Sequence, residues 1–308
     1  MKNKKIIAFV TSFVLIFLSV KITNAQQNAI SLAVTPPLFE VIIKPGKEVK
    51  QVYNITNNGG DTLLVPKIFY FDVEGDGGNV SLTENPAPAW IKYSRDPFNL
   101  KAQETKQFNV LISPPEDAEE IDHFVTLIFE TVAPTDVLFQ NETFYKSQIG
   151  TNILVTISKD GNPKKSAEIV EFKATKIIDS VFGDIKYEVK LKNNGNSYWK
   201  PIGKIIFNDT KSIKLAPQNV LSGSNRNILC LTDENLVECK IPKSSVVGLF
   251  DIGKRISSLE FSVDDDPKVY KAVTETFVFP FTSLGMLLML LTLYRVKGIF
   301  KVWQKRRP

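Results

Sequence analysis

Apolar and polar residues alternate along much of the chain with a period of two. In residues 185–192 every odd position is apolar and every even position is charged. Phe108, Val110 and Ile112 alternate with the polar residues 107 and 109, and Ile153, Val155 and Ile157 lie opposite the polar residues 152, 156 and 158. Because successive side chains of a strand point to opposite faces, each run predicts a β-strand with one packed face and one wet face.

Helical periodicity is nearly absent before the C-terminal region. Runs rich in Val, Ile, Phe and Thr are separated by clusters of Gly, Pro, Asn and Asp, which is typical of β-sandwiches. The sequence predicts an all-β chain with two tandem Ig-like β-sandwich domains, at 28–158 and 166–274. Residues 159–165 are polar, contain Gly161 and Pro163, and form the predicted linker.

A short pattern occurs once in each predicted domain. An alternating strand runs into Asn57-Asn58-Gly59, and another runs into Asn193-Asn194-Gly195; each is followed by a proline and a further apolar strand. Asn and Gly tolerate the backbone that such turns need. The pattern favours a duplicated design, and chance similarity of two hairpins is the alternative.

Residues 1–25 have the pattern of a secretory signal peptide. Three lysines precede an apolar run over 6–20, and the small residues Thr23 and Ala25 suit a cut before Gln26. An uncleaved N-terminal anchor is the alternative. The segment predicts that the following residues lie outside the cytoplasm.

A second apolar stretch lies near the C-terminus. Residues 277–294 are uncharged, and several Arg and Lys residues follow them. This pattern predicts a single transmembrane helix at 277–299 and a basic cytoplasmic tail at 300–308. The chain would then be a single-pass protein of the cytoplasmic membrane. A buried helix, a lipid-anchor signal and a sortase signal around 279–283 are the alternatives.

Composition indicates a folded protein, because 43% of the 308 residues are hydrophobic and 23% are charged. The net charge of +5 comes from the basic ends, and the segment between them is acidic. The charge therefore gives no indication of nucleic-acid binding.

Residues suited to catalysis are scarce. His123 is the single histidine, and the sequence lacks a nucleophile elbow, a phosphate loop and a set of zinc ligands. We expect His123 to be structural and predict no catalytic, cofactor or metal residues. Residues 72–76 resemble half of a calcium loop, but they are equally explained as a hairpin tip.

The two cysteines, Cys230 and Cys239, flank a polar stretch. In an exported protein this spacing predicts a disulfide across a hairpin, with free thiols as the alternative. Four aromatic residues beside predicted loops, Trp90, Tyr93, Tyr198 and Trp199, are candidates for contact with a ligand or partner. They can equally close the ends of a sandwich core.

The first predicted domain resembles the sandwiches of pilus chaperones and major sperm proteins. The resemblance rests on the order of Val34-Thr35-Pro36-Pro37, Pro45-Gly46, Asn57-Asn58-Gly59 and Pro114-Pro115. The second domain resembles that of bacterial WxL-interacting surface proteins, through residues 194–196, 201–203 and 221–226, with Ser222 where a proline is usual.

These resemblances imply a non-enzymatic, membrane-anchored cell-surface protein that binds cell-wall peptidoglycan or another surface protein. The first alternative is a tethered chaperone-like assembly factor that completes a partner's sheet by β-strand addition. An exposed hydrophobic edge strand in the first domain would favour it. The less favoured alternative is an extracytoplasmic hydrolase with paired carboxylates.

Overall fold

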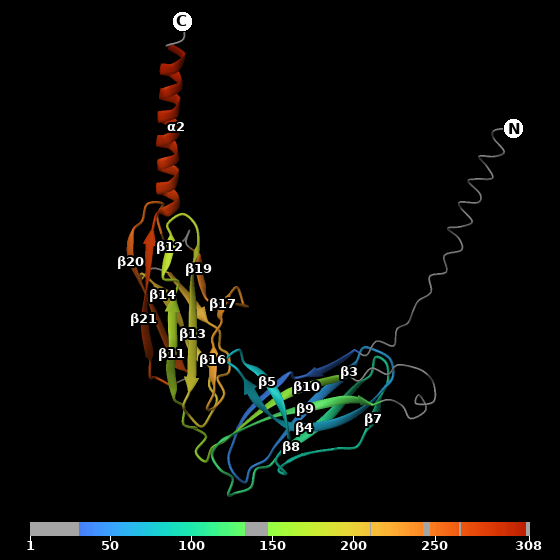
Figure 1. Cartoon of the computed structure of the whole chain (residues 1–308). Helices are drawn as coiled ribbons and strands as arrows, with labels where there is room; N and C mark the ends of the chain where they lie inside the picture. The colour runs from blue at the N-terminus through green and yellow to red at the C-terminus, as the bar shows by residue number, and fades with distance from the viewer. Residues whose placement is uncertain (1–30, 133–146, 210, 243–246, 265, 306–308) are drawn as a thin grey trace, which may run out of the picture.

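The computed structural model describes residues 31–132, 147–209, 211–242, 247–264 and 266–305. They form two Ig-like β-sandwiches and one C-terminal helix (Figure 1). The sandwiches meet at an angle, and the helix leaves the end of the second sandwich that lies away from the first. The predicted signal peptide at 1–25 lies outside the described residues.

The first sandwich consists of sheets A and B. Sheet A has the order β1 (Leu32–Thr35), β3 (Val49–Asn57), β8 (Thr105–Ile112) and β6 (Ile91–Tyr93). Sheet B has the order β2 (Leu38–Ile43), β10 (Gln148–Ile157), β9 (Asp122–Val132), β4 (Thr62–Glu74) and β5 (Asn79–Pro86), with β7 (Phe98–Leu100) paired to β4. Inward residues such as Tyr53, Phe129 and Ile153 are fully buried between the sheets.

The N-terminal strands change sheets at Pro36 and Pro37. Strand β1 pairs antiparallel with β3, and β2 pairs parallel with β10. A proline has no N–H to donate, so two in succession interrupt the ladder. Strand β2 thereby becomes the outermost strand of sheet B.

The second sandwich consists of sheets C and D. Sheet C has the order β11 (Ala167–Ala174), β13 (Asp184–Asn193) and β16 (Asn225–Asn227), with β19 (Lys240–Pro242) paired to β13. Sheet D has the order β12 (Ile177–Asp179), β21 (Tyr270–Phe279), β20 (Gly253–Val263), β14 (Pro201–Phe207), β15 (Lys211–Leu215), β17 (Cys230–Thr232) and β18 (Asn235–Val237). Trp199, Phe207 and Phe261 fill its core.

The repeated Asn-Asn-Gly pattern forms the same turn in both sandwiches. Asn57 and Asn193 end β3 and β13 and are almost completely buried. The Oδ1 atom of Asn57 accepts the Gly59 N–H at 2.9 Å, and that of Asn193 accepts the Gly195 N–H at 2.8 Å. The side chain thus acts as part of the turn in each domain.

The predicted alternation is confirmed in β13, whose odd residues from 185 to 191 are buried. Strand β10 differs, because Thr156 and the following Ser158, expected on its wet face, are buried, as is Leu154 on the same face. The second sandwich packs against that face, with Tyr198 and Leu221 beside Leu154. A wet face in one domain has become an interface in the whole chain.

The prediction of a transmembrane helix at 277–299 is corrected by the structure. Strand β21 continues to Phe279, and helix α2 spans Phe281–Lys305. Its uncharged part, 281–294, is shorter than the roughly 20 residues of a membrane span. Among the described residues, no helix is both long and apolar enough to cross a membrane.

Candidate functional site

The two sandwiches are joined by a partly buried carboxylate, Asp122 at the start of β9. Its Oδ1 accepts the Thr156 hydroxyl at 2.6 Å, and its Oδ2 accepts the Tyr198 N–H of the second sandwich at 2.5 Å. The nearby Ser197 and Ser222 side chains also favour its ionised form. Burial raises the pKa of Asp122 to about 6, although these hydrogen bonds lower it.

Apolar and ionic contacts surround this joint. Phe71 and Leu154 of sheet B pack with Leu221 of the second sandwich. Glu40 of β2 pairs with Lys200 at 2.7 Å and accepts a hydrogen bond from the Asn219 amide. These contacts reach across the chain and hold the outer face of sheet B against the second sandwich.

The turn between β4 and β5 makes a further contact. Asp76 pairs with Lys190 of β13 at 2.7 Å, and its carbonyl oxygen accepts the Asn227 N–H. This contact lies opposite the Glu40 contact across the outer face of sheet B. Between the two contacts the sandwiches leave an open space.

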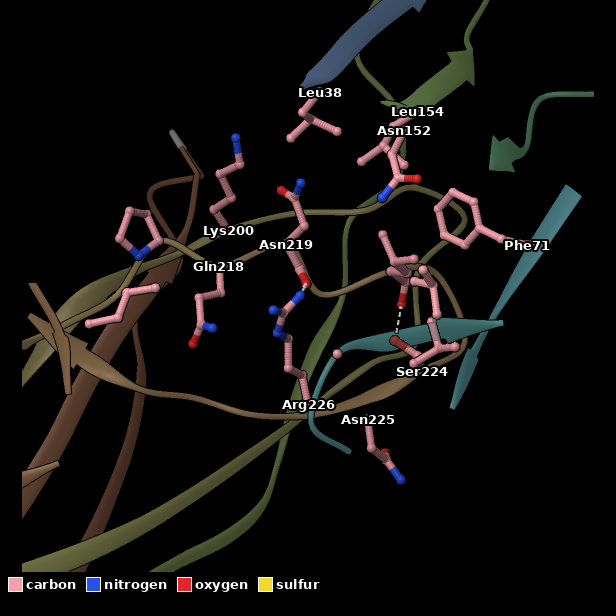
Figure 2. Close-up of a pocket in the computed structure, with 16 residues that line it drawn as sticks. Leu38, Phe71, Asn152, Leu154, Lys200, Gln218, Asn219, Ser224, Asn225 and Arg226 are labelled. Carbon is pink, nitrogen blue, oxygen red and sulfur yellow. Dashed lines mark hydrogen bonds between the residues drawn. The ribbon is translucent and has the colours of Figure 1, made fainter. Parts of the chain in front are cut away.

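That space is a pocket of about 390 Å³ (Figure 2). Sheet B supplies an apolar wall, and the segment 217–226 of the second sandwich supplies a mostly polar one. The apolar side consists of Leu38, Phe71, Val73, Val80 and Leu154, and the opposite side includes Lys200, Gln218, Asn219, Ser224, Asn225 and Arg226. Its size lies within the range of small-ligand sites.

Arg226 is the unusual charge in this pocket. Its Nη1 donates to the Asn219 carbonyl, as Figure 2 shows, but its buried Nε has no partner. Among the described residues, no carboxylate lies within 4.0 Å of its guanidinium. Burial lowers the pKa of Arg226.

Strand β2 borders the pocket through Leu38, and among the described residues it is an open edge of sheet B. The Pro37 and Ile43 carbonyls accept the N–H groups of Asn152 and Ser158 in the β10 segment. In a parallel ladder, alternate residues face the partner strand. The N–H and C=O groups of Leu38, Glu40 and Ile42 therefore point away from β10, toward the open edge.

The four aromatic residues named from the sequence do not gather at this site. The Tyr93 hydroxyl accepts the Ile68 N–H at 3.1 Å, and Trp90 packs edge-on against His123 at 5.0 Å. Trp199 is 0% exposed in the second core, and Tyr198 packs in the joint. None of the four lines the pocket, and each makes packing or hydrogen-bond contacts within the chain.

The remaining candidates from the sequence are accounted for separately. Cys230 and Cys239 form a disulfide across the hairpin of β17 and β18. His123 lies in β9 with its Nδ1 3.1 Å from the Tyr70 hydroxyl. The described residues contain no cluster of three potential metal ligands, and Asp76 of the calcium-like segment pairs with Lys190.

Comparisons with known proteins give distant structural matches. The Escherichia coli chaperone DraB aligns with a TM-score of 0.39 and 12% identity, over 79% of this chain and 98% of its own. A Salmonella enterica SafA pilin in complex with the SafB chaperone aligns with a TM-score of 0.39 and 12% identity, over 80% of this chain and 98% of the matched chain. The class 5 fimbriae chaperone CfaA aligns with a TM-score of 0.39 and 11% identity, over 79% of this chain and 99% of its own.

No protein-family model matches the chain, and no curated protein matches its sequence. The predicted resemblance to WxL-interacting surface proteins is therefore not confirmed. The Ig-like sandwich itself is present in both halves of the chain.

Proposed function

We propose that this protein is a chaperone-like assembly factor that holds a partner polypeptide by β-strand addition to the open edge of β2. The observation that carries the proposal is the outward backbone of this strand, at Leu38, Glu40 and Ile42. An added strand would form hydrogen bonds with these N–H and C=O groups, and its alternate side chains would contact the surface beside β2.

The side chains of β2 support this role. Five of its six residues are apolar, and Leu38 and Ile42 are 39% and 46% exposed. Edge strands that must avoid pairing carry Lys, Pro or inward charges. The single charge of β2, Glu40, is instead held by Lys200 and Asn219. The edge is thus left without the usual protection.

The opposite edge of sheet B provides the contrast. Strand β5 contains Glu84, Asn85 and Pro86, all exposed, and its register on β4 shifts at Phe69/Phe71. Proline and irregular register both discourage pairing. Sheet B thus has one edge, β5, that discourages strand pairing and one edge, β2, that permits it, so an added strand would pair at β2 alone.

We place this activity outside the cytoplasm and assign it no catalysis. The disulfide between Cys230 and Cys239 supports an oxidising compartment, as does the signal-peptide pattern of 1–25. In intact cells, alkylating reagents should leave both thiols unmodified until a reductant is added. Modification without reduction would contradict this location.

The test of strand addition uses an Ig-like domain from which the last strand has been deleted, so that its open edge drives aggregation. The full chain should suppress the light scattering of this domain. Backbone amides of Leu38, Glu40 and Ile42 should exchange at least ~10-fold more slowly in the mixture, because they become hydrogen-bonded.

Ile42→Pro should abolish both effects without unfolding the protein, because it removes an N–H that points away from β10. Ile42→Ala keeps this N–H and is the matched control. Unchanged suppression by Ile42→Pro, or amide protection on β5 instead of β2, would contradict the proposal.

A further inference from the structure

Arg226 differs from the other cations at the contact between the two sandwiches. Lys200 and Lys190 each have a carboxylate at 2.7 Å, from Glu40 and Asp76 respectively. Arg226 has no such partner within 4.0 Å among the described residues. Arg226 is half-buried, and a cation partly removed from water without a counter-ion is disfavoured. An anion bound in the pocket would offset this cost.

The structure holds the guanidinium in place. Its Nη1 is bonded to the Asn219 carbonyl, and a Cβ atom at Gly78 would lie 2.5 Å from its Cζ. Gly78, at a φ of +80°, therefore gives the side chain room against the β4–β5 turn. Both domains shape the position of this charge.

Other groups of the pocket describe the rest of the ligand. The Oδ1 atoms of Asn219 and Asn225 are buried acceptors without hydrogen-bond partners, so they suit a donor group on the ligand and not its anionic end. The facing wall is apolar, with Leu38, Phe71 and Leu154. A charged group at one side and an apolar body at the other match this arrangement.

The disulfide-bonded hairpin completes the wall. Leu236 of β18 lines the pocket and is 57% exposed. Strands β17 and β18 have three residues each, and so short a hairpin is marginal alone. The bond between Cys230 and Cys239 ties its two ends.

We propose that the pocket binds a small organic anion, with a carboxylate or phosphate opposite Arg226 and an apolar chain against Leu38, Phe71 and Leu154. The Cys230–Cys239 hairpin holds Leu236 over this chain. The anion site uses the side chain of Leu38, whereas strand addition uses the outward backbone of β2 up to Ile42, so the failure of one and of the other are distinguishable.

The test is calorimetric titration of the full chain with octanoate and octyl phosphate, with octanol and octylamine as the uncharged and cationic probes. At least one anion should bind at least ~10-fold more tightly than either control. The two anions distinguish a carboxylate site from a phosphate site. Equal binding of octanol would overturn the proposal, as would the absence of binding by both anions.

Variants locate the site. Arg226→Gln should weaken anion binding at least ~10-fold, and Arg226→Lys should recover part of it. Arg95→Gln, which removes an exposed arginine beside Tyr93 in the first sandwich, should change nothing. Unaltered binding by Arg226→Gln would reject the assignment.

Two further variants separate the contributions. The double variant Cys230→Ser, Cys239→Ser should bind the anion more weakly while its circular dichroism spectrum remains that of the parent; unweakened binding would remove the hairpin from the proposal. Ile42→Pro should bind the anion like the parent. A loss there would mean that pocket and edge are one site, which contradicts the inference.

Discussion

The turns at Asn57 and Asn193 have the same local structure and different surroundings. The Asn57 amide donates to the carbonyls of Gly60, Leu100 and Lys101, all within the first sandwich. The Asn193 amide donates to the carbonyls of Ser197 and Val220.

The turn at Asn193 also carries the joint between the domains. Asn194 and Asn196 donate their N–H groups to the carbonyls of Ser166 and Lys164 in the linker region. Ser197 and Tyr198, which follow directly, meet Thr156 and Asp122 of the first sandwich. One short motif therefore closes a single domain in the first case and positions two domains in the second.

Removal of each asparagine side chain gives the largest expected effect. Asn57→Ala and Asn193→Ala should each lower the free energy of unfolding by about 2–4 kcal/mol, because buried carbonyl groups lose their donors. Urea denaturation measures the loss.

Hydrogen exchange then sharpens the comparison. Asn193→Ala should also speed exchange of the Tyr198 amide, which donates across the joint, whereas Asn57→Ala should leave it unchanged. Equal acceleration in both variants would show that the joint does not depend on the turn at Asn193.

Substitution of Gly195 tests the contact with the linker. A Cβ atom there would lie 2.7 Å from the Lys164 carbonyl oxygen and 2.8 Å from the Ser166 nitrogen. Gly195→Ala should therefore cost about 1–3 kcal/mol by denaturation, since backbone atoms must move. Gly248→Ala is the control, because nothing lies within 4 Å of its Cβ position. Equal losses would refute a specific steric cause.

Local features of the fold could be predicted from the sequence. The period of two in 185–192 identifies β13, and the Asn-Asn-Gly pattern identifies both turns. The spacing of Cys230 and Cys239 likewise suits the disulfide that the structure contains. Each of these depends on residues close together in the chain.

The interdomain site could not be predicted in the same way. Asp122 and Tyr198 are 76 residues apart, and Glu40 and Lys200 are 160 apart. Single polar residues at such separations leave no periodic signal. The apolar run 277–294 misled for a related reason, because its first residues belong to strand β21 and are paired with β20. A hydrophobic run indicates that its residues are buried, but it does not show whether they pack in a protein core or in a membrane.

The smallest expected effect is the pH dependence of the joint, which arises from Asp122. Three carboxylates lie near Tyr198 and, together with the larger effect of burial, raise its pKa: Glu40, Asp122 and Asp264. Glu40 is paired with Lys200, and Asp264 is paired with Lys165. Among the described residues Asp122 has no cation within 4.0 Å, and burial raises its pKa to about 6.

Between pH ~4 and ~6 the folded protein keeps a proton on Asp122 that the unfolded chain has released. Raising the pH through this window should therefore lower the free energy of unfolding, by on the order of 1–2 kcal/mol after allowance for solvent screening. Urea denaturation from pH 4 to 7 measures this slope. Asp122→Asn cannot ionise and should flatten it. If the parent and Asp122→Asn kept the same slope, the pH dependence would have to come from other groups, and the joint would be held equally well by the ionised and protonated carboxyl.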